Sequence, residues 1–408
     1  MKVLFLFGGL PHYYNAILNR LNEINGLEIV VAVPKSKGKA VGEGVFQTDE
    51  NIKFKVIELE EKQSLYGKPY FANLANALSE ETPDAVVVIW PYVLSFLFDR
   101  KVKRVVSDKK IKLIYKDIPF RIPYYKDVFS WEGESYYDEN LVYEKSNGLF
   151  PMFRRITLGL IRKAYLNKMD AHVYYTEESK EIISSYGVDK DKIFVIYNSV
   201  DNMELERALE NAKNEPPLLP SNEKRIIHVG RLVKWKRVDL LIEAVKSVSE
   251  KFESVELLVV GNGPELENLK RLAVNLGIKE KVVFYGAVYD SATMANLMLG
   301  SSIYVLAGMG GLSINEAMCY GKPVICSVCD GTEKKLVREG YNGLYFEEGN
   351  KNDLADKIKY LFDNPQLIET FGENSKKIID DEINVDTVIK GYVDAFNYVS
   401  EKEKLEFN

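Results

Sequence analysis

The sequence predicts an α/β protein of two domains, each with a parallel sheet covered by helices. Short apolar runs that read as strands alternate with helical segments along most of the 408 residues, the order expected of parallel sheets. The run from Ala85 to Ile89 is continuously apolar, as in a strand buried on both faces. The chain is also longer than one ordinary domain. These three observations together predict two α/β domains.

The composition is that of a water-soluble globular protein, with 46% hydrophobic and 28% charged residues. Met1-Lys2 is followed by only five strongly apolar residues before Gly8-Gly9, which suits a first strand better than an export signal. The longest apolar run, Ala85 to Phe98, is shorter than the about 20 residues that a helix needs to span a bilayer. We expect a cytoplasmic protein that touches the inner face of the cell membrane only peripherally, and no nucleic-acid partner.

The cysteines give no support for a metal or redox site. Three cysteines are too few for a disulfide framework, and the C-x-x-C of Cys326 and Cys329 has no second pair beside it. We interpret them as small core residues, and expect neither a metal nor another cofactor.

The charge is uneven along the chain. Residues 1–200 hold 28 basic and 26 acidic residues, whereas the whole chain has a net charge of −6. Such basic clusters fit ordinary solvated helix faces, and they also fit contact with an anionic membrane or a phosphorylated acceptor. The two clusters are Arg100, Lys101, Lys103, Arg104, Lys109, Lys110, Lys112 and Lys116, and then Arg154, Arg155, Arg162, Lys163 and Lys168.

The first half contains seven expected strands and four expected helical segments. The strands are Val3–Phe7, Leu27–Val33, Ile52–Ile57, Ala85–Ile89, Ile111–Tyr115, His172–Tyr175 and Ile193–Ile196. The helices follow Pro11-His12 or span Phe71–Leu78, Tyr92–Val106 and Phe150–Met169. The last of these is amphipathic and suits either a core-facing helix or a membrane surface.

Residues Phe120 to Phe150 interrupt this alternation. They hold nine aromatic side chains mixed with charges and show no clean period. Long irregular loops in compact domains are usually functional or mobile. We predict a loop on the acceptor side of a binding site, and a structural lid is the alternative.

The second half repeats the alternation. Its expected strands are Arg225–Val229, Val255–Val260, Val282–Tyr285, Ile303–Leu306, Pro323–Cys326 and Asn342–Phe346. A helix is expected over Lys236–Val248 and another begins at Ser313. The chain after Phe346 is expected to be helical to Phe407, with a long last helix over Val385–Tyr398. The proline-rich segment 211–224 suggests a domain boundary near residue 200. The expected domains are 1–200 and 201–384, with 385–408 as a helix returning to the first domain.

The stretch from Ser301 to Ser327 reads as an anion site. A strand is followed by a turn with Gly308, Gly310 and Gly311 and then by a helix with Glu316 in its first turn. Glycines let the backbone approach a ligand, and the free N–H groups of a helix start attract an anion. Carboxyl ends of parallel strands share one rim, so Arg231 and Lys236 are expected nearby as cations suited to a diphosphate.

Several motifs of the second half resemble the retaining glycosyltransferases of family 4. They are G-R-L-x-x-x-K-x-x-x-x-L-I-x-A from Gly230, the G-N-G-P turn from Gly261, the V-V-F-Y-G segment from Val282, N-S-V-D from Asn198, and G-G-L-S-I-N-E-A-M-C-Y-G-K-P-V-I from Gly310. These motifs cover about half of the chain. The first half matches mainly in its strand and helix order and in Gly8-Gly9.

The resemblance implies the GT-B architecture, in which two Rossmann-like domains face each other across a cleft. It also implies a nucleotide-diphosphate sugar as donor (UDP- or GDP-sugar), transfer with retention, and no metal, because Arg231 and Lys236 carry the charge. Glu316 would then take the ribose hydroxyls. Backbone around the donor would come from Gly8, Gly9, Gly230, Gly261, Gly286, Val288, Gly308, Gly310, Gly311, Leu312 and Ser313.

One departure concerns the donor sugar. The family pattern has two glutamates with seven residues between them; Glu316 matches the second, and the first falls on Gly308. On the acceptor side, Lys116-Asp117 and His12 are the candidates, with a surface turn and a structural histidine as alternatives. The predicted function is a hexosyltransferase acting on a glycan or lipid-linked acceptor in cell-surface polysaccharide synthesis. A degenerate nucleotide-sugar-binding partner and a sugar-nucleotide epimerase are the alternatives.

Overall fold

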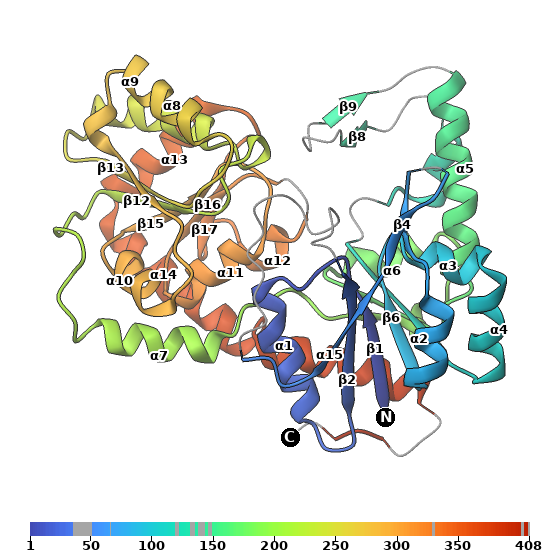
Figure 1. The fold of residues 1–408 in the computed structure, drawn as a ribbon. Helices are drawn as coiled ribbons and strands as arrows, with labels where there is room; N and C mark the ends of the chain where they lie inside the picture. Colours follow the sequence, from blue (N-terminus) through green and yellow to red (C-terminus); the bar gives the residue numbers. More distant parts are fainter. Residues whose placement is uncertain are drawn as a thin grey trace. The chain divides into compact units, whose positions relative to one another are not determined.

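The chain folds into two compact units. The computed structural model describes residues 1–35, 51–65, 67–118, 122–130, 135–137, 143–145, 149–328, 331–400 and 404–406. The first unit consists of Met1–Tyr197 and Asp386–Asn408, and the second of Asn198–Val385. The chain therefore crosses between the units twice, next to the residues 200 and 385 where the sequence suggested domain limits. Each unit is built around its own sheet (Figure 1).

The first unit contains a seven-stranded parallel sheet in the order β11-β10-β7-β6-β1-β2-β3. Its strands are β1 (Lys2–Leu6), β2 (Glu28–Pro34), β3 (Lys55–Leu59), β6 (Ala85–Val88), β7 (Lys112–Asp117), β10 (Ala171–Tyr174) and β11 (Ile193–Val195). All four residues of β6 are fully buried, which fits its unbroken apolar sequence. The predicted parallel sheet is confirmed, with strand limits shifted by at most three residues.

Helices flank this sheet, and one of the predicted helices is split. The helices are α1 (His12–Glu23), α2 (Leu74–Glu81), α3 (Val93–Phe98), α4 (Arg100–Asp108), α5 (Leu149–Leu166) and α6 (Glu178–Ser184). The prediction of one helix over 92–106 was wrong. Asp99 has an extended backbone, and its carboxylate caps α4 by accepting from the N–H groups of Lys101 (2.8 Å) and Val102 (3.3 Å).

The segment predicted as an irregular loop holds some regular structure. A 3-10 helix spans η3 (Tyr125–Phe129), and β8 (Ser135–Tyr137) pairs antiparallel with β9 (Tyr143–Lys145). A second small antiparallel pair, β4 (Glu61–Gln63) and β5 (Pro69–Phe71), lies earlier in the chain. Residues 119–121, 131–134, 138–142 and 146–148, which include Phe120 and Trp131, lie outside the described residues. The acceptor-side role of this segment therefore stays a prediction.

The last helix, α15 (Val385–Val399), packs on the first unit. The rings of Tyr392 and Phe396 lie 5.9 and 6.4 Å from that of Phe5 in β1. The predicted last helix, Val385–Tyr398, is confirmed to within one residue. The expectation that the chain stays helical as far as Phe407 was wrong, because residues 404–406 are not helical. Beyond α15, the N–H of Leu405 donates to the side chain of Asn397 at 2.7 Å, which folds the chain back on the helix.

The second unit contains a six-stranded parallel sheet in the order β14-β13-β12-β15-β16-β17. Its strands are β12 (Arg225–Val229), β13 (Glu256–Val260), β14 (Val282–Gly286), β15 (Ile303–Leu306), β16 (Val324–Cys326) and β17 (Gly343–Tyr345). The strand order runs outward in one direction from β12 and in the other from β15. The crevice between β12 and β15 is thus the switch point at which open α/β sheets bind ligands.

Helices surround this second sheet as well. They are α7 (Asn202–Ala212), α8 (Val238–Ser249), α9 (Leu266–Asn275), α10 (Ser291–Leu299), α11 (Leu312–Cys319), α12 (Glu333–Leu336), α13 (Lys351–Asp363) and α14 (Pro365–Asp381); short 3-10 turns are η4 (Lys190–Lys192) in the first unit and η5 (Lys234–Lys236) and η6 (Lys279–Lys281) in the second. Across the described parts of both units, no helix combines the length and the apolar character needed to cross a bilayer.

A buried asparagine fixes α11 to both ends of the second unit. The Asn315 carboxamide is fully buried, and its oxygen accepts from the N–H of Val200 (3.0 Å) and the hydroxyl of Ser199 (3.1 Å). Its nitrogen donates to the carbonyl of Ile383 at 3.2 Å. Because buried amides are costly to leave unpaired, these bonds hold the helix that begins at the glycine turn in one position.

Candidate functional site

Three loops at the carboxyl edge of the second sheet are bonded to one another through their backbones. The N–H of Gly230, after β12, donates to the carbonyl of Val260 at 3.0 Å, and the N–H of Gly261 donates to Gly286 at 2.8 Å. A Cβ on Gly261 would overlap the carbonyl oxygen of Gly230, and one on Gly263 would lie 2.8 Å from the nitrogen of Leu232. These glycines therefore permit loops to cross closely.

The loop after β15 is packed in the same way against the turn that follows β12. The N–H of Met309 donates to the carbonyl of Trp235 at 2.9 Å. A Cβ on Gly308 would overlap that carbonyl and lie 2.7 Å from the carbonyl carbon of Lys236. The absence of a glutamate at 308 thus has a physical cause, since the backbone of Trp235–Lys236 occupies the space of a side chain.

Lys236 is placed by a 3-10 turn and does not belong to a helix. The prediction that a helix begins at Lys236 was wrong, because η5 ends there and Arg237 adopts a left-handed backbone (φ 51°) before α8 begins at Val238. The amine of Lys236 lies against Gly310 so closely that a Cβ there would overlap Nζ. Its Cε is 3.6 Å from a Cβ placed on Gly230. A cation thus lies between the two glycine loops.

Arg231 lies in the same group of loops. Its guanidinium is over the Trp235 ring, 5.6 Å from the centroid, a distance at which cation and ring attract. Trp235 also accepts the N–H of Met309, so the ring that orients Arg231 and the loop after β15 belong to one packed assembly.

The start of α11 is open to an anion. Its N-cap, Gly311, makes no capping hydrogen bond through a side chain, and the first N–H groups of a helix, here those of Leu312 and Ser313, have no intrahelical acceptor. The Ser313 hydroxyl accepts from the buried Tyr304 hydroxyl at 2.7 Å, which orients this turn. Thr332 lies close to Gly311: its hydroxyl oxygen is 2.6 Å from the position that a Cβ on Gly311 would take.

Glu316 lies just beyond the first turn of α11. The helix begins at Leu312, one residue earlier than expected, and no acidic residue lies in its first turn, so the expected position of Glu316 within that turn was wrong. The half-buried carboxylate has no hydrogen-bond or ion-pair partner within the described residues, and loss of solvation raises the pKa of Glu316 to about 7. A desolvated, unpaired carboxylate is a ready acceptor for ligand hydroxyls.

The first unit brings its own candidates together at the carboxyl edge of its sheet. Lys116, in β7, is buried, and its amine donates to the Tyr175 hydroxyl, which in turn lies 2.9 Å from the hydroxyl of Tyr14 in α1. Burial lowers the pKa of Lys116 to about 7. Asp117 accepts from the Tyr115 hydroxyl at 2.5 Å and is half-buried. The surface-turn alternative for Lys116 was therefore wrong, because its amine is enclosed by tyrosines.

His12 and the first glycine pair lie on the same edge. His12 is the exposed first residue of α1, with its ring 5.6 Å from that of Tyr13. Gly8 and Gly9 are buried between β1 and α1. Tyr14 follows His12 by two residues and its ring is 5.0 Å from the Lys116 amine, so the start of α1 and the end of β7 are neighbours.

Sequence reasoning missed several residues of these two edges. Tyr14 and Tyr175 were counted only as helix and strand residues, and Trp235 and Tyr304 were not singled out. His228 was not singled out either, although it lies two residues before Gly230. Its position near the end of a strand that leads into a glycine turn could have indicated that it lies close to the site.

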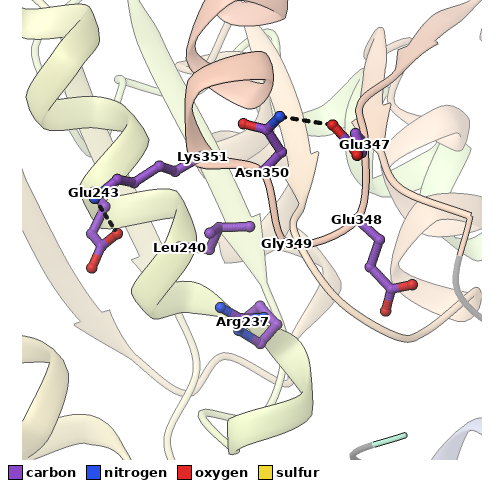
Figure 2. Close-up of a pocket in the computed structure, with 8 residues that line it drawn as sticks. All are labelled: Arg237, Leu240, Glu243, Glu347, Glu348, Gly349, Asn350 and Lys351. Carbon is purple, nitrogen blue, oxygen red and sulfur yellow. Dashed lines mark hydrogen bonds and ion pairs between the residues drawn. The ribbon is translucent and has the colours of Figure 1, made fainter.

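A polar cavity of about 500 Å³ lies between α8 and the loop after β17. Figure 2 shows Arg237 at one end and the Lys351–Glu243 ion pair (3.0 Å) at the other. Asn350 donates to Glu347 at 2.8 Å and so fixes the loop. The predicted donor residues do not line this cavity.

The described residues contain no group of three or more histidine, cysteine or acidic side chains arranged to hold a metal ion. Cys319 and Cys326 are both buried and reduced. Cys329, the partner in the C-x-x-C pair, lies outside the described residues.

Comparison with known proteins matches the second unit to one family and the whole fold to several solved structures. Residues 210–378 match the family model described as glycosyl transferases group 1. An uncharacterized glycosyltransferase of Methanocaldococcus jannaschii is 30% identical over 241 residues, 58% of this chain and 60% of the relative. The poly(ribitol-phosphate) alpha-N-acetylglucosaminyltransferase of Staphylococcus aureus is 27% identical over 57% of this chain and 44% of its own length. The matches thus span about half the length of these relatives.

Two solved structures share the fold over nearly the whole chain. A glycosyltransferase from Rickettsia africae aligns with a TM-score of 0.69 and 16% identity, covering 98% of this chain and 99% of its own. An Anabaena protein crystallised in complex with UDP aligns with a TM-score of 0.66 and 19% identity, covering 96% and 98%. The predicted α/β fold class of the GT-B type is confirmed.

Replacement of Glu316 by glutamine should stabilise the second unit in a pH-dependent way. The pKa of Glu316 is raised from its ordinary value of 4.5 to about 7, so the cost of its charge to the folded state grows as the pH rises from 4.5 to 7 and is fully present above pH 7. We expect Glu316→Gln to raise the free energy of unfolding by about 2–3 kcal/mol at pH 8 and by less than about 1 kcal/mol at pH 5. Urea unfolding at the two pH values measures this, and an equal effect at both would contradict it.

Gly308→Ala should destabilise the fold, because its Cβ has no space beside Trp235. A forced backbone shift of this kind costs about 1–3 kcal/mol in the free energy of unfolding. Gly277→Ala is the control: Gly277 has a positive φ of 68° but open space around it, so it reports backbone strain alone. Urea denaturation of both variants checks this, and a Gly308→Ala protein as stable as the wild type would disprove the close approach.

Proposed function

We propose that this protein transfers a sugar from a nucleotide-diphosphate sugar to a glycan or lipid-linked acceptor, because residues 210–378 match the family model described as glycosyl transferases group 1. The observation that carries the proposal is the position of the Lys236 amine against Gly310, immediately before the open start of α11. A cation and unpaired N–H groups at one place suit a diphosphate.

The chemistry needed at this place is stabilisation of a leaving group. When the bond between the sugar carbon and the diphosphate oxygen breaks, negative charge builds on that oxygen. The Lys236 ammonium, the Arg231 guanidinium and the N–H groups of Leu312 and Ser313 are preorganised donors for this charge. Such donors act by lowering the barrier of the charge-separating step.

The nucleoside would extend from the diphosphate along the same rim. Glu316 supplies an unpaired carboxylate for the two ribose hydroxyls, and the loop from Gly286 to Val288 lies at the end of β14 for the base. UDP is the first nucleotide to test, since the Anabaena protein of similar fold was crystallised with it. GDP follows because nothing in the loop after β14 distinguishes the two bases.

The acceptor side is assigned to the first unit. The tyrosine-enclosed Lys116, Asp117 and the exposed His12 offer polar groups at the carboxyl edge of its sheet. Hydroxyl-rich acceptors are recognised by such groups. We further propose retention of configuration at the sugar and a reaction that needs no metal, on the resemblance of the Gly230 and Gly310 motifs to retaining enzymes. Nuclear magnetic resonance of the product's anomeric centre and assays with EDTA test these two points.

We also propose that an anionic bilayer is the surface on which the acceptor is met. From Leu149 to Lys168 the chain carries five basic and no acidic residues, and α5 exposes Phe153 and Leu160. Phe98, at the end of α3, is 62% exposed and α3 contacts both α4 and α5 (Figure 1). Exposed aromatic and basic side chains together favour the headgroup region of anionic lipid.

Removal of the predicted phosphate cations should abolish transfer without unfolding the protein. We expect Arg231→Ala and Lys236→Ala each to lower kcat by about 10²–10³-fold, measured as consumption of UDP- and GDP-sugars with a membrane extract as acceptor source. The matched control is Lys234→Ala, an exposed lysine of the same turn. Wild-type turnover in either folded variant would contradict the proposal.

The same assays with UDP- and GDP-sugars distinguish the transferase from the two alternative functions. Binding of a nucleotide sugar with no consumption in any extract would indicate a binding partner without transferase activity. Conversion of the donor in the absence of acceptor would indicate an epimerase. Either result would replace the proposed transfer reaction.

Reversal of charge on α5 should weaken membrane binding. In a vesicle flotation assay, we expect the protein to bind vesicles of phosphatidylglycerol and phosphatidylcholine but not vesicles of phosphatidylcholine alone. The double variant Arg154→Glu/Lys163→Glu should lower the bound fraction at least about tenfold, because each basic residue contributes about 1 kcal/mol to binding. Lys279→Glu/Lys377→Glu, two exposed lysines of the second unit, gives the same net charge. Equal loss in both double variants would contradict the assigned surface.

A further inference from the structure

The two central strands of the second sheet separate at their carboxyl ends. The ladder between β12 and β15 pairs Ile226 with Ile303 and Ile227 with Tyr304 and stops there. On its other side β12 remains paired with β13 as far as Val229 and Val260. The pairing of β12 therefore ends early only on the side of β15, at the switch point, where the chain continues into the loops that hold Lys236 and Gly310.

His228 lies where the ladder between β12 and β15 stops. It is fully buried, and its Nδ1 lies 3.1 Å from the carbonyl oxygen of Val305, a group released from the ladder by the separation. Because a carbonyl only accepts, Nδ1 carries the hydrogen, and Nε2 of the neutral ring is left with a lone pair. Nε2 is buried and has no hydrogen-bond partner among the residues that the structure describes.

The unpaired nitrogen and the side chain of Lys236 lie beside the same glycine, Gly230. A Cβ placed on Gly230 would be 3.7 Å from Nε2 of His228 and 3.6 Å from Cε of Lys236, so both side chains lie beside the same glycine. Burial, and secondly the charge of Lys236, lower the pKa of His228 to about 4. At neutral pH the ring is therefore uncharged and does not repel the lysine.

We propose that His228 is a positioning residue for Lys236: its Nε2 accepts a hydrogen bond from the Lys236 ammonium when a nucleoside diphosphate is bound. The lysine has three N–H donors, so one is held by the imidazole and the others face the phosphates. The bond to Val305 fixes the ring, and through it the amine, to the two central strands. This inference rests on the proposed function and adds a residue to its donor site.

Two substitutions test the roles of the two ring nitrogens separately. His228→Asn keeps a donor for the Val305 carbonyl and removes the acceptor at the position of Nε2. His228→Gln places an acceptor near the position of Nε2 and gives up the bond to Val305. Urea unfolding of both variants shows whether either has lost stability, so that binding is compared between folded proteins.

The test is a double-mutant cycle on UDP affinity, measured by calorimetry at pH 7.5. We expect His228→Asn to raise the Kd about tenfold in the presence of Lys236, as for loss of a hydrogen bond to a charged group, and less than about twofold in a Lys236→Ala background. His228→Gln should stay within about threefold of the wild type.

Equal losses from His228→Asn in both backgrounds, or no loss in either, would overturn the positioning role while leaving UDP binding by the wild type intact. A wild-type protein that binds neither UDP nor GDP would instead overturn the proposed function, and this inference with it. The two failures are therefore distinguished by the wild-type titration alone.

Discussion

The close approach of two backbones organises the candidate site of the second unit. The turn at Trp235 meets the loop after β15 at Gly308, where the hydrogen bond from Met309 N–H to the Trp235 carbonyl measures 2.9 Å. This contact sets the direction of Lys236, whose amine ends over Gly310 at the start of α11. It also explains the glycine at 308, since a side chain there would separate the cation from the helix start. A sugar-binding carboxylate and this packing cannot occupy the same space.

Buried side chains of the second sheet and of α11 also hold this site in place. Asn315 holds α11 to the segments around Val200 and Ile383, so the helix start cannot drift away from the lysine. His228 lies where the ladder between β12 and β15 stops. The charged groups at the surface thus rest on buried polar side chains that are each fixed by defined hydrogen bonds, which is the condition for preorganised electrostatics.

Much of this arrangement could be predicted from sequence, because strands and glycine turns carry strong local signals. The strands Arg225–Val229 and Ile303–Leu306 have the predicted limits, and the neighbouring turns, with Arg231 and Lys236, belong to one rim. Backbone contacts between distant segments left no such signal. Hence the role of Gly308 and Gly261 in loop crossing, the 3-10 turn at Lys236 and the second-turn position of Glu316 appeared only in the structure. The split at Asp99 was missed because an apolar period continued across a capping residue.

We infer that the diphosphate binds between Lys236 and the start of α11. A crystal structure of the protein with UDP tests it most directly. We expect phosphate oxygens within hydrogen-bond distance of Lys236 Nζ and of the N–H groups of Leu312 and Ser313, with the ribose hydroxyls on Glu316. A diphosphate bound elsewhere, for example in the cavity beside Arg237 and Glu348, with Lys236 untouched, would contradict the account.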